Sequence, residues 1–177
     1  MKTNLLILLM LVVNISNAQE TKRPKVSSFF DIPVENLMGI VDFDLQEVAK
    51  RVNIKNESTD YRKMSRIISW YQTKTDSIYE VNRFELDAIE SAYWKKVRAI
   101  DDMNNYDHVF HVAKEYVDQV KPYSPPIKAL ESEMNGWVYG FLNAKQYSKW
   151  ESYLAKKHKM MKPKTPMPMN SLPGELL

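Results

Sequence analysis

The sequence predicts an all-α protein, an elongated helical hairpin or bundle of four to five helices. From Ile40 to Lys121 it contains no glycine and no proline, and such stretches favour long helices. Apolar residues in this stretch recur at spacings of three and four, the period of a helix. The chain has no cysteine and only four glycines. This composition excludes disulfide-stabilised folds, Cys-ligated metal sites and glycine-rich phosphate loops.

The first 18 residues have the pattern of a secretory signal peptide. Lys2 precedes an apolar run from Leu5 to Val13, and small residues follow at Ser16 and Ala18, which predicts cleavage between Ala18 and Gln19. Nine apolar residues rise about 14 Å as a helix, roughly half of a hydrocarbon core. We therefore expect a periplasmic or secreted protein without stable membrane insertion.

The positions of proline and glycine predict the segment boundaries after the signal peptide. Residues 19–39 form a lead-in that ends at Gly39, and 40–158 form one helical domain. Asp44 with Glu47 three residues later predicts a capping box for the first helix of this domain. This helix is amphipathic, and its apolar face consists of Leu45, Val48, Ala49 and Val52.

The next predicted helix spans about 58–102 and begins at Ser58 or Thr59. A helix of this length extends roughly 65 Å, whereas a compact protein of this size is about 40 Å across. The helix is therefore either kinked or part of an elongated homodimer that buries the excess apolar stripe. The stripe consists of Met64, Ile68, Tyr71, Ile78, Leu86, Ile89, Tyr93, Val97 and Ile100.

Three shorter segments follow the long helix. A helix over about 106–120 is expected to stop at Pro122, and Ser124 with Pro125 predicts a new start. After Gly140 the last helix is expected to begin at Asn143, with Gln146 completing a capping box. Residues 159–177 are rich in Met, Pro and Lys, which predicts a disordered tail.

The segment at the last helix start resembles the LTxxQ motif of the Spy/CpxP family, periplasmic helical proteins of the envelope stress response. Leu142, Asn143 and Gln146 stand where Leu, Thr and Gln stand in that motif, and Trp150 stands where an aromatic residue often follows. Asn143 replaces Thr but keeps the cap chemistry. In the family the motif occurs twice, and segment 54–58 matches the first copy only loosely.

The resemblance implies an ATP-independent chaperone or stress-response protein that binds unfolded or partly folded envelope proteins. Trp70, Val81 and Phe84 project from the long helix opposite its main stripe and form a candidate surface. These residues could be a dimer seam, further core or a client-binding surface. A purely structural partner of an envelope complex is another possibility.

A metal-binding or metal-sensing protein is the alternative. Thioether and imidazole ligands suit Cu(I), and the C-terminal segment contains His158, Met160, Met161, Met167 and Met169. His108, His111 and Glu115 share helical spacing but lie on a polar face, so we interpret them as solvated. No cofactor is predicted, and no residue constellation indicates an enzyme.

The charge distribution argues against nucleic-acid binding. Residues 19–155 carry 19 basic and 21 acidic residues, and five lysines from Lys156 to Lys164 follow. A near-neutral body with a basic tail is not the basic surface that nucleic acids require.

Overall fold

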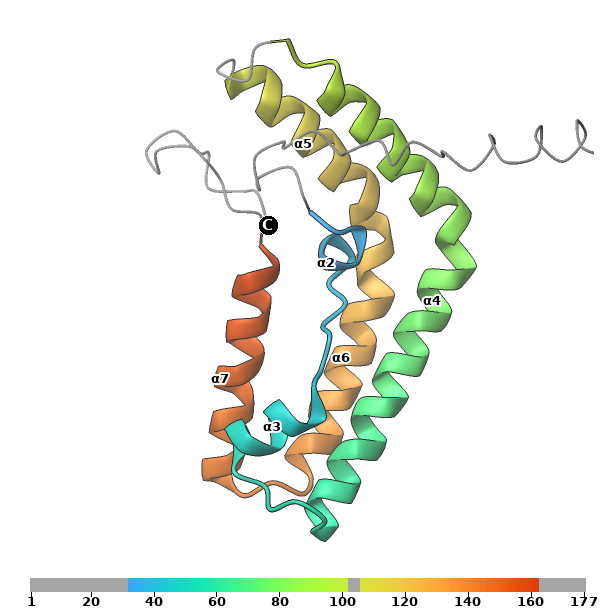
Figure 1. Ribbon diagram of the computed structural model, residues 1–177. Helices are drawn as coiled ribbons and strands as arrows, with labels where there is room; N and C mark the ends of the chain where they lie inside the picture. Colours follow the sequence, from blue (N-terminus) through green and yellow to red (C-terminus); the bar gives the residue numbers. More distant parts are fainter. Residues whose placement is uncertain (1–31, 102–105, 163–177) are drawn as a thin grey trace, which may run out of the picture.

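The computed structural model describes residues 32–101 and 106–162, and all regular elements within these ranges are helical (Figure 1). The predicted all-α class is therefore confirmed. The predicted signal peptide, its predicted cleavage site and the part of the predicted tail from 163 onward lie outside the described residues. The elements are α2 (Val34–Met38), α3 (Leu45–Val52), α4 (Thr59–Arg98), α5 (Tyr106–Val120), the 3₁₀ turn η1 (Lys121–Tyr123), α6 (Ser124–Tyr139) and α7 (Ala144–Met161).

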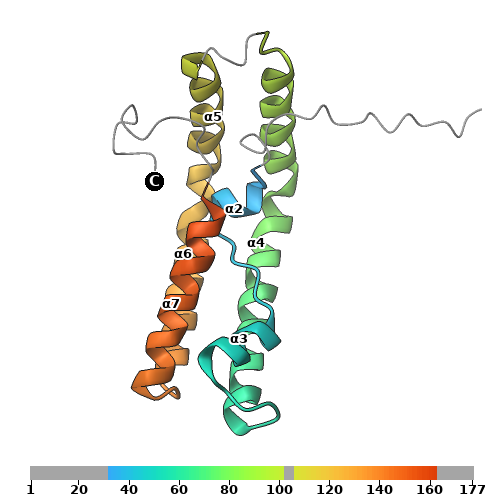
Figure 2. The same cartoon turned by 60° about the vertical axis from the view of Figure 1, so that its left-hand side comes forward.

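The helices form an elongated bundle around α4. The chain turns back after α4, and α5, η1 and α6 together run antiparallel beside its whole length (Figures 1 and 2). Helix α7 then runs back antiparallel to α6 (Figures 1 and 2) and packs against α3, which also contacts α4. The α3–α4 loop and the α6–α7 turn consequently lie at the same end of the molecule.

Helix α4 confirms the predicted long helix, with 40 residues between the Ser58 cap and Arg98. The rise of 1.5 Å per residue makes it about 60 Å long. Its predicted stripe packs against α6 in the first half and against α5 in the second half, all within one chain. The argument from helix length for a homodimer is therefore wrong, while the oligomeric state itself stays a prediction.

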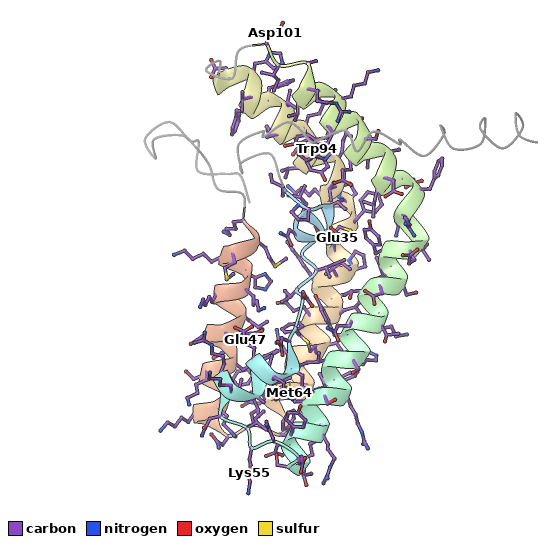
Figure 3. All side chains as sticks on the ribbon, viewed as in Figure 1. Glu35, Glu47, Lys55, Met64, Trp94 and Asp101 are labelled. Atoms are coloured by element: carbon purple, nitrogen blue, oxygen red, sulfur yellow. The ribbon has the colours of Figure 1, made fainter. Side chains whose placement is uncertain are left out.

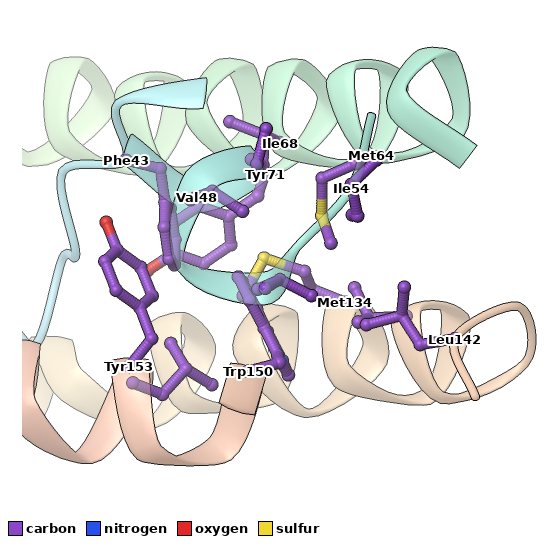
Figure 4. Packing of buried hydrophobic residues seen from close by; sticks show 14 of the residues in the cluster. Phe43, Val48, Ile54, Met64, Ile68, Tyr71, Met134, Leu142, Trp150 and Tyr153 are labelled. Atoms are coloured by element: carbon purple, nitrogen blue, oxygen red, sulfur yellow. The ribbon is translucent and has the colours of Figure 1, made fainter. Parts of the chain in front are cut away.

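The buried side chains form two clusters along the bundle. The first lies between α3, the start of α4, the end of α6 and α7, and Figure 4 shows its packing. Its large members include Trp150, Tyr71, Tyr153, Phe43 and Met134. The second lies between α2, the rest of α4, α5 and the start of α6, and includes Met38, Leu86, Tyr93, Tyr116 and Ile127.

The connection between α5 and α6 differs from the prediction. Pro122 does not end the helical path, because the chain passes through η1 directly into α6. A proline lacks the N–H of a regular α-helix but is tolerated in a short 3₁₀ turn. Ser124 does not cap α6. Its hydroxyl instead donates a hydrogen bond of 3.1 Å to the carbonyl of Leu37 in α2.

The predicted lead-in contributes to the core. Residues 34–38 form the short helix α2, whose Val34 and Met38 are buried. Gly39 ends α2 with φ of +89°, a left-handed conformation that glycine adopts without strain. The extended chain that follows buries Val41 and Phe43. The helical domain therefore begins before residue 40.

The C-terminal boundary also shifts. Helix α7 continues to Met161, so residues 159–161, assigned to the tail from sequence, are helical.

Candidate functional site

The residues that carry the motif resemblance are structural in this fold. Leu142 and Trp150 are buried, and the Trp150 indole N–H donates a 2.9 Å hydrogen bond to the amide oxygen of Asn135 in α6. Asn143 caps α7, because its side-chain oxygen accepts from the backbone N–H of Gln146 at 3.0 Å. The Gln146 side chain accepts in return from the N–H of Asn143, which completes the predicted capping box.

Gln146 also joins the two loops at this end of the bundle. Its amide nitrogen donates a 3.2 Å hydrogen bond to the carbonyl of Asn53. Asn53 ends α3 in the left-handed conformation, with φ of +65°. One side chain therefore caps α7 and holds the α6–α7 turn against the end of α3. This tertiary bond was not predicted from sequence.

We expect Asn143→Ala and Gln146→Ala each to lower the free energy of unfolding by about 1 kcal/mol. The sequence alone predicted a smaller effect for Gln146, but its bond to Asn53 raises the expected cost. Gln146→Glu separates the two roles, since a carboxylate can accept from Asn143 but cannot donate to Asn53. Denaturant unfolding of the three variants measures this, and an unchanged stability of Asn143→Ala would contradict the cap.

Glu47 connects α3 to α7. The predicted capping box of α3 forms only in part. The Asp44 side chain accepts from the backbone N–H groups of Gln46 and Glu47, but the Glu47 side chain does not accept from the backbone N–H of Asp44 in return. The Glu47 carboxylate instead accepts a hydrogen bond from the Tyr153 hydroxyl and pairs with Lys157, both at 3.2 Å. The hydrogen bond from Lys157 is the main cause that lowers the pKa of Glu47.

The three residues of the candidate surface lie in different environments. The side chains of Val81 and Phe84 on α4 are 82% and 88% exposed, although both are large and apolar. Trp70 is half-buried, and its ring packs at 4.4 Å against that of Trp137 from α6. Trp70 is therefore partly covered by its own chain. We define Val81 and Phe84 as the α4 patch.

Charged side chains of both signs surround the α4 patch. Arg83 lies between its two residues in the sequence and pairs with Glu80 at 3.4 Å and with Asp87 at 3.7 Å. All three charged side chains are more than half exposed. The patch thus presents two apolar side chains on α4 beside a solvated network of charged side chains.

The predicted metal-ligand residues that fall within the described ranges do not lie close together. The His158 imidazole lies 3.0 Å from the Glu131 carboxylate, Met161 packs at the edge of the first cluster, and Met160 is 69% exposed. Met167 and Met169 lie outside the described residues. Glu115 pairs with Lys96, and His108 and His111 are exposed. Within 32–101 and 106–162, no three His, Asp or Glu side chains gather as a metal site.

One small cavity lies within the described part of the chain. It measures about 10 Å³ and lies between α4 and α5, where Tyr93, Lys96, Glu115, Tyr116 and Gln119 are among its lining residues. This volume has room for about one water molecule. None of the helices in the described part of the chain is sufficiently long and apolar to span a membrane.

Comparison with known proteins adds no family to these observations. No protein-family model, curated protein or solved structure matches this chain. The candidate site therefore rests on the structure alone, and it consists of the exposed α4 patch with the charged residues beside it.

Proposed function

We propose that this protein is an exported, periplasmic, ATP-independent chaperone that binds partly unfolded polypeptides through the α4 patch. The observation that carries the proposal is the exposure of Val81 and Phe84 on a helix whose other face is packed into the core. Exposed apolar groups rimmed by charges are typical of surfaces that bind other proteins. The resemblance around Leu142 and Gln146 to Spy/CpxP proteins supports the same function.

The charges explain how such a surface stays soluble. Arg83 and its partners keep water around the patch, while Val81 and Phe84 offer apolar contact to an exposed segment of a client. Burial of apolar area supplies about 25 cal/mol per Å², so two side chains give a weak and reversible interaction. Reversible binding needs no nucleotide to release the client.

We expect Val81→Ser/Phe84→Ser to lose protection of an aggregating client without loss of stability. Both side chains are exposed, so their replacement changes the free energy of unfolding by less than about 0.5 kcal/mol. The test follows the turbidity of a chemically unfolded model protein in the presence of excess chain beginning at Gln19. The matched control is Tyr139→Ser, which removes a 68% exposed aromatic residue from α6.

Each outcome of this assay decides a point. Aggregation that the wild-type chain leaves unaltered would refute the chaperone function. Equal loss in Tyr139→Ser would refute the assignment to the α4 patch. We retain a homodimer as part of the proposal, and light scattering on the same variants tests it. If the patch substitution converts a dimer to a monomer, Val81 and Phe84 form the seam between copies instead of the client surface.

The metal-binding alternative makes a different prediction. It requires the segment that contains Met167 and Met169, whereas the chaperone function does not. Deletion of residues 163–177 should therefore leave client protection unchanged, and α7 remains complete in that variant.

A further inference from the structure

The fold separates charge along the bundle. Segments 44–74 and 128–162 together carry 14 basic and seven acidic residues, whereas segment 75–121 carries six basic and ten acidic residues. The first two segments contain α3, the start of α4, most of α6 and all of α7. At the end of the molecule where the α3–α4 loop and the α6–α7 turn lie, with Lys55 at its tip (Figure 3), segments 53–66 and 135–151 carry six basic and three acidic residues. We call this the basic end.

Exposed lysines at the basic end have no ion-pair partner among the described residues. Lys55 lies in the α3–α4 loop, and Lys145 and Lys149 lie in the first turns of α7. All three side chains are exposed and form no salt bridge within 32–101 and 106–162. Their charge is therefore available to an external anion.

Aromatic side chains occupy the same end. Tyr139 is 68% and Trp137 is 43% exposed, while Phe141 and Tyr147 are half-buried. The Tyr147 ring packs edge-on against Tyr139 at 5.0 Å, and Lys63 lies 5.5 Å above the Phe141 ring. Side chains two positions apart on an α-helix point in directions that differ by about 200° around its axis. Trp137 and Tyr139 therefore project from opposite sides of α6.

We propose that the basic end binds the surface of an anionic lipid bilayer, peripherally and without crossing it. Tryptophan, tyrosine and lysine side chains with apolar bodies and polar tips prefer the headgroup region. Lysines near an anionic leaflet add an electrostatic attraction. A polypeptide partner would favour a one-sided groove, whereas these aromatic side chains lie around the end of the bundle.

The proposal is independent of the proposed function but compatible with it. Along α4, Phe84 lies 21 residues beyond Lys63, which corresponds to about 32 Å at the rise of a helix. A bilayer at the basic end would leave the α4 patch exposed above it. The protein would then hold clients close to a membrane surface.

Sedimentation with lipid vesicles tests the proposal on the chain that begins at Gln19. We expect binding to vesicles of equal phosphatidylglycerol and phosphatidylcholine, weakened by added salt, and little binding to phosphatidylcholine alone. Each basic residue near an anionic surface contributes about a fivefold gain in affinity. Lys55→Glu/Lys145→Glu/Lys149→Glu should therefore bind at least about 100-fold more weakly.

The matched control is Lys95→Glu/Arg98→Glu/Lys121→Glu, which changes the net charge equally outside the basic end. All three side chains are exposed, and both variants retain residues 156–177. Circular dichroism checks that the helices persist. The control should bind within about twofold of wild type. Equal losses in both triple variants, or wild-type binding by the first, would overturn the proposal.

Tryptophan fluorescence provides a second readout. The emission of the wild-type chain should shift to the blue on anionic vesicles, and Trp137→Phe should reduce the shift, because Trp137 is the most accessible tryptophan at the basic end. A shift unaffected by this substitution would contradict contact through the basic end. Binding of an acidic unfolded polypeptide by the basic end, with no binding to vesicles, would also overturn the proposal.

Discussion

Replacing Trp150 by alanine is expected to lower the free energy of unfolding by about 3–5 kcal/mol, the usual cost of removing a buried aromatic side chain. Trp150 is fully buried, and its ring stacks on that of Phe43 with centroids 5.5 Å apart. It also holds α7 to α6 through its hydrogen bond to Asn135. The substitution would leave both a cavity and an unpaired amide.

Denaturant unfolding measures this effect, and Trp137→Ala is the matched control. Trp137 is 43% exposed, so its loss should cost no more than about 1–2 kcal/mol. A Trp150→Ala variant as stable as the control would mean that α7 does not dock on the first cluster as described.

Raising the pH from about 10 to 12 should destabilise the protein through its buried tyrosines. Burial raises the pKa of Tyr71 to about 12 from an ordinary value of 10.0. The unfolded chain therefore loses this proton at a lower pH than the folded chain. The stabilisation is complete below pH 10 and is lost as the pH rises through the folded pKa. Two pKa units correspond to about 3 kcal/mol.

Tyr71→Phe identifies the contribution of this residue. The variant removes the titrating group and also the hydrogen bond that the backbone N–H of Val41 donates to the hydroxyl at 3.2 Å. It should lose about 1–2 kcal/mol at neutral pH and show a shallower decline above pH 10. Burial raises the pKa of Tyr116 as well, so part of the decline should remain. An identical pH profile in the variant would contradict this interpretation.

The regular elements could be predicted from sequence because their signals are local. Helical spacing identified the α4 stripe, and Ser58 and Asn143 marked helix starts through contacts within three residues. These caps satisfy backbone N–H groups that any helix start exposes. Local chemistry therefore fixed the helix boundaries to within a few residues.

The missed features depend on contacts between distant segments. Phe43 lies in a stretch without helical periodicity, and only its packing on Trp150 and Tyr71 makes it core. The position of Ser124 would allow its hydroxyl to cap a helix, but in the fold this hydroxyl donates a hydrogen bond to the carbonyl of Leu37. No sequence spacing indicates such partners.

The candidate surface was predictable only in part for the same reason. Helical spacing correctly placed Val81 and Phe84 away from the main stripe, and both are exposed. Trp70 lies on the same side of α4, but its environment depends on Trp137 in α6. The charge separation along the bundle likewise emerges only when 44–74 and 128–162 are brought together.

Site-specific photocrosslinking tests the proposed client surface most directly. Val81→p-benzoylphenylalanine places a reactive ring in the α4 patch, and the same substitution at Asp118 places it on the exposed side of α5. We expect an unfolded client to crosslink at position 81, with crosslinking competed by unlabelled client, and not at position 118. Equal crosslinking at the two positions, or none at position 81 while aggregation is still suppressed, would contradict client binding through the α4 patch.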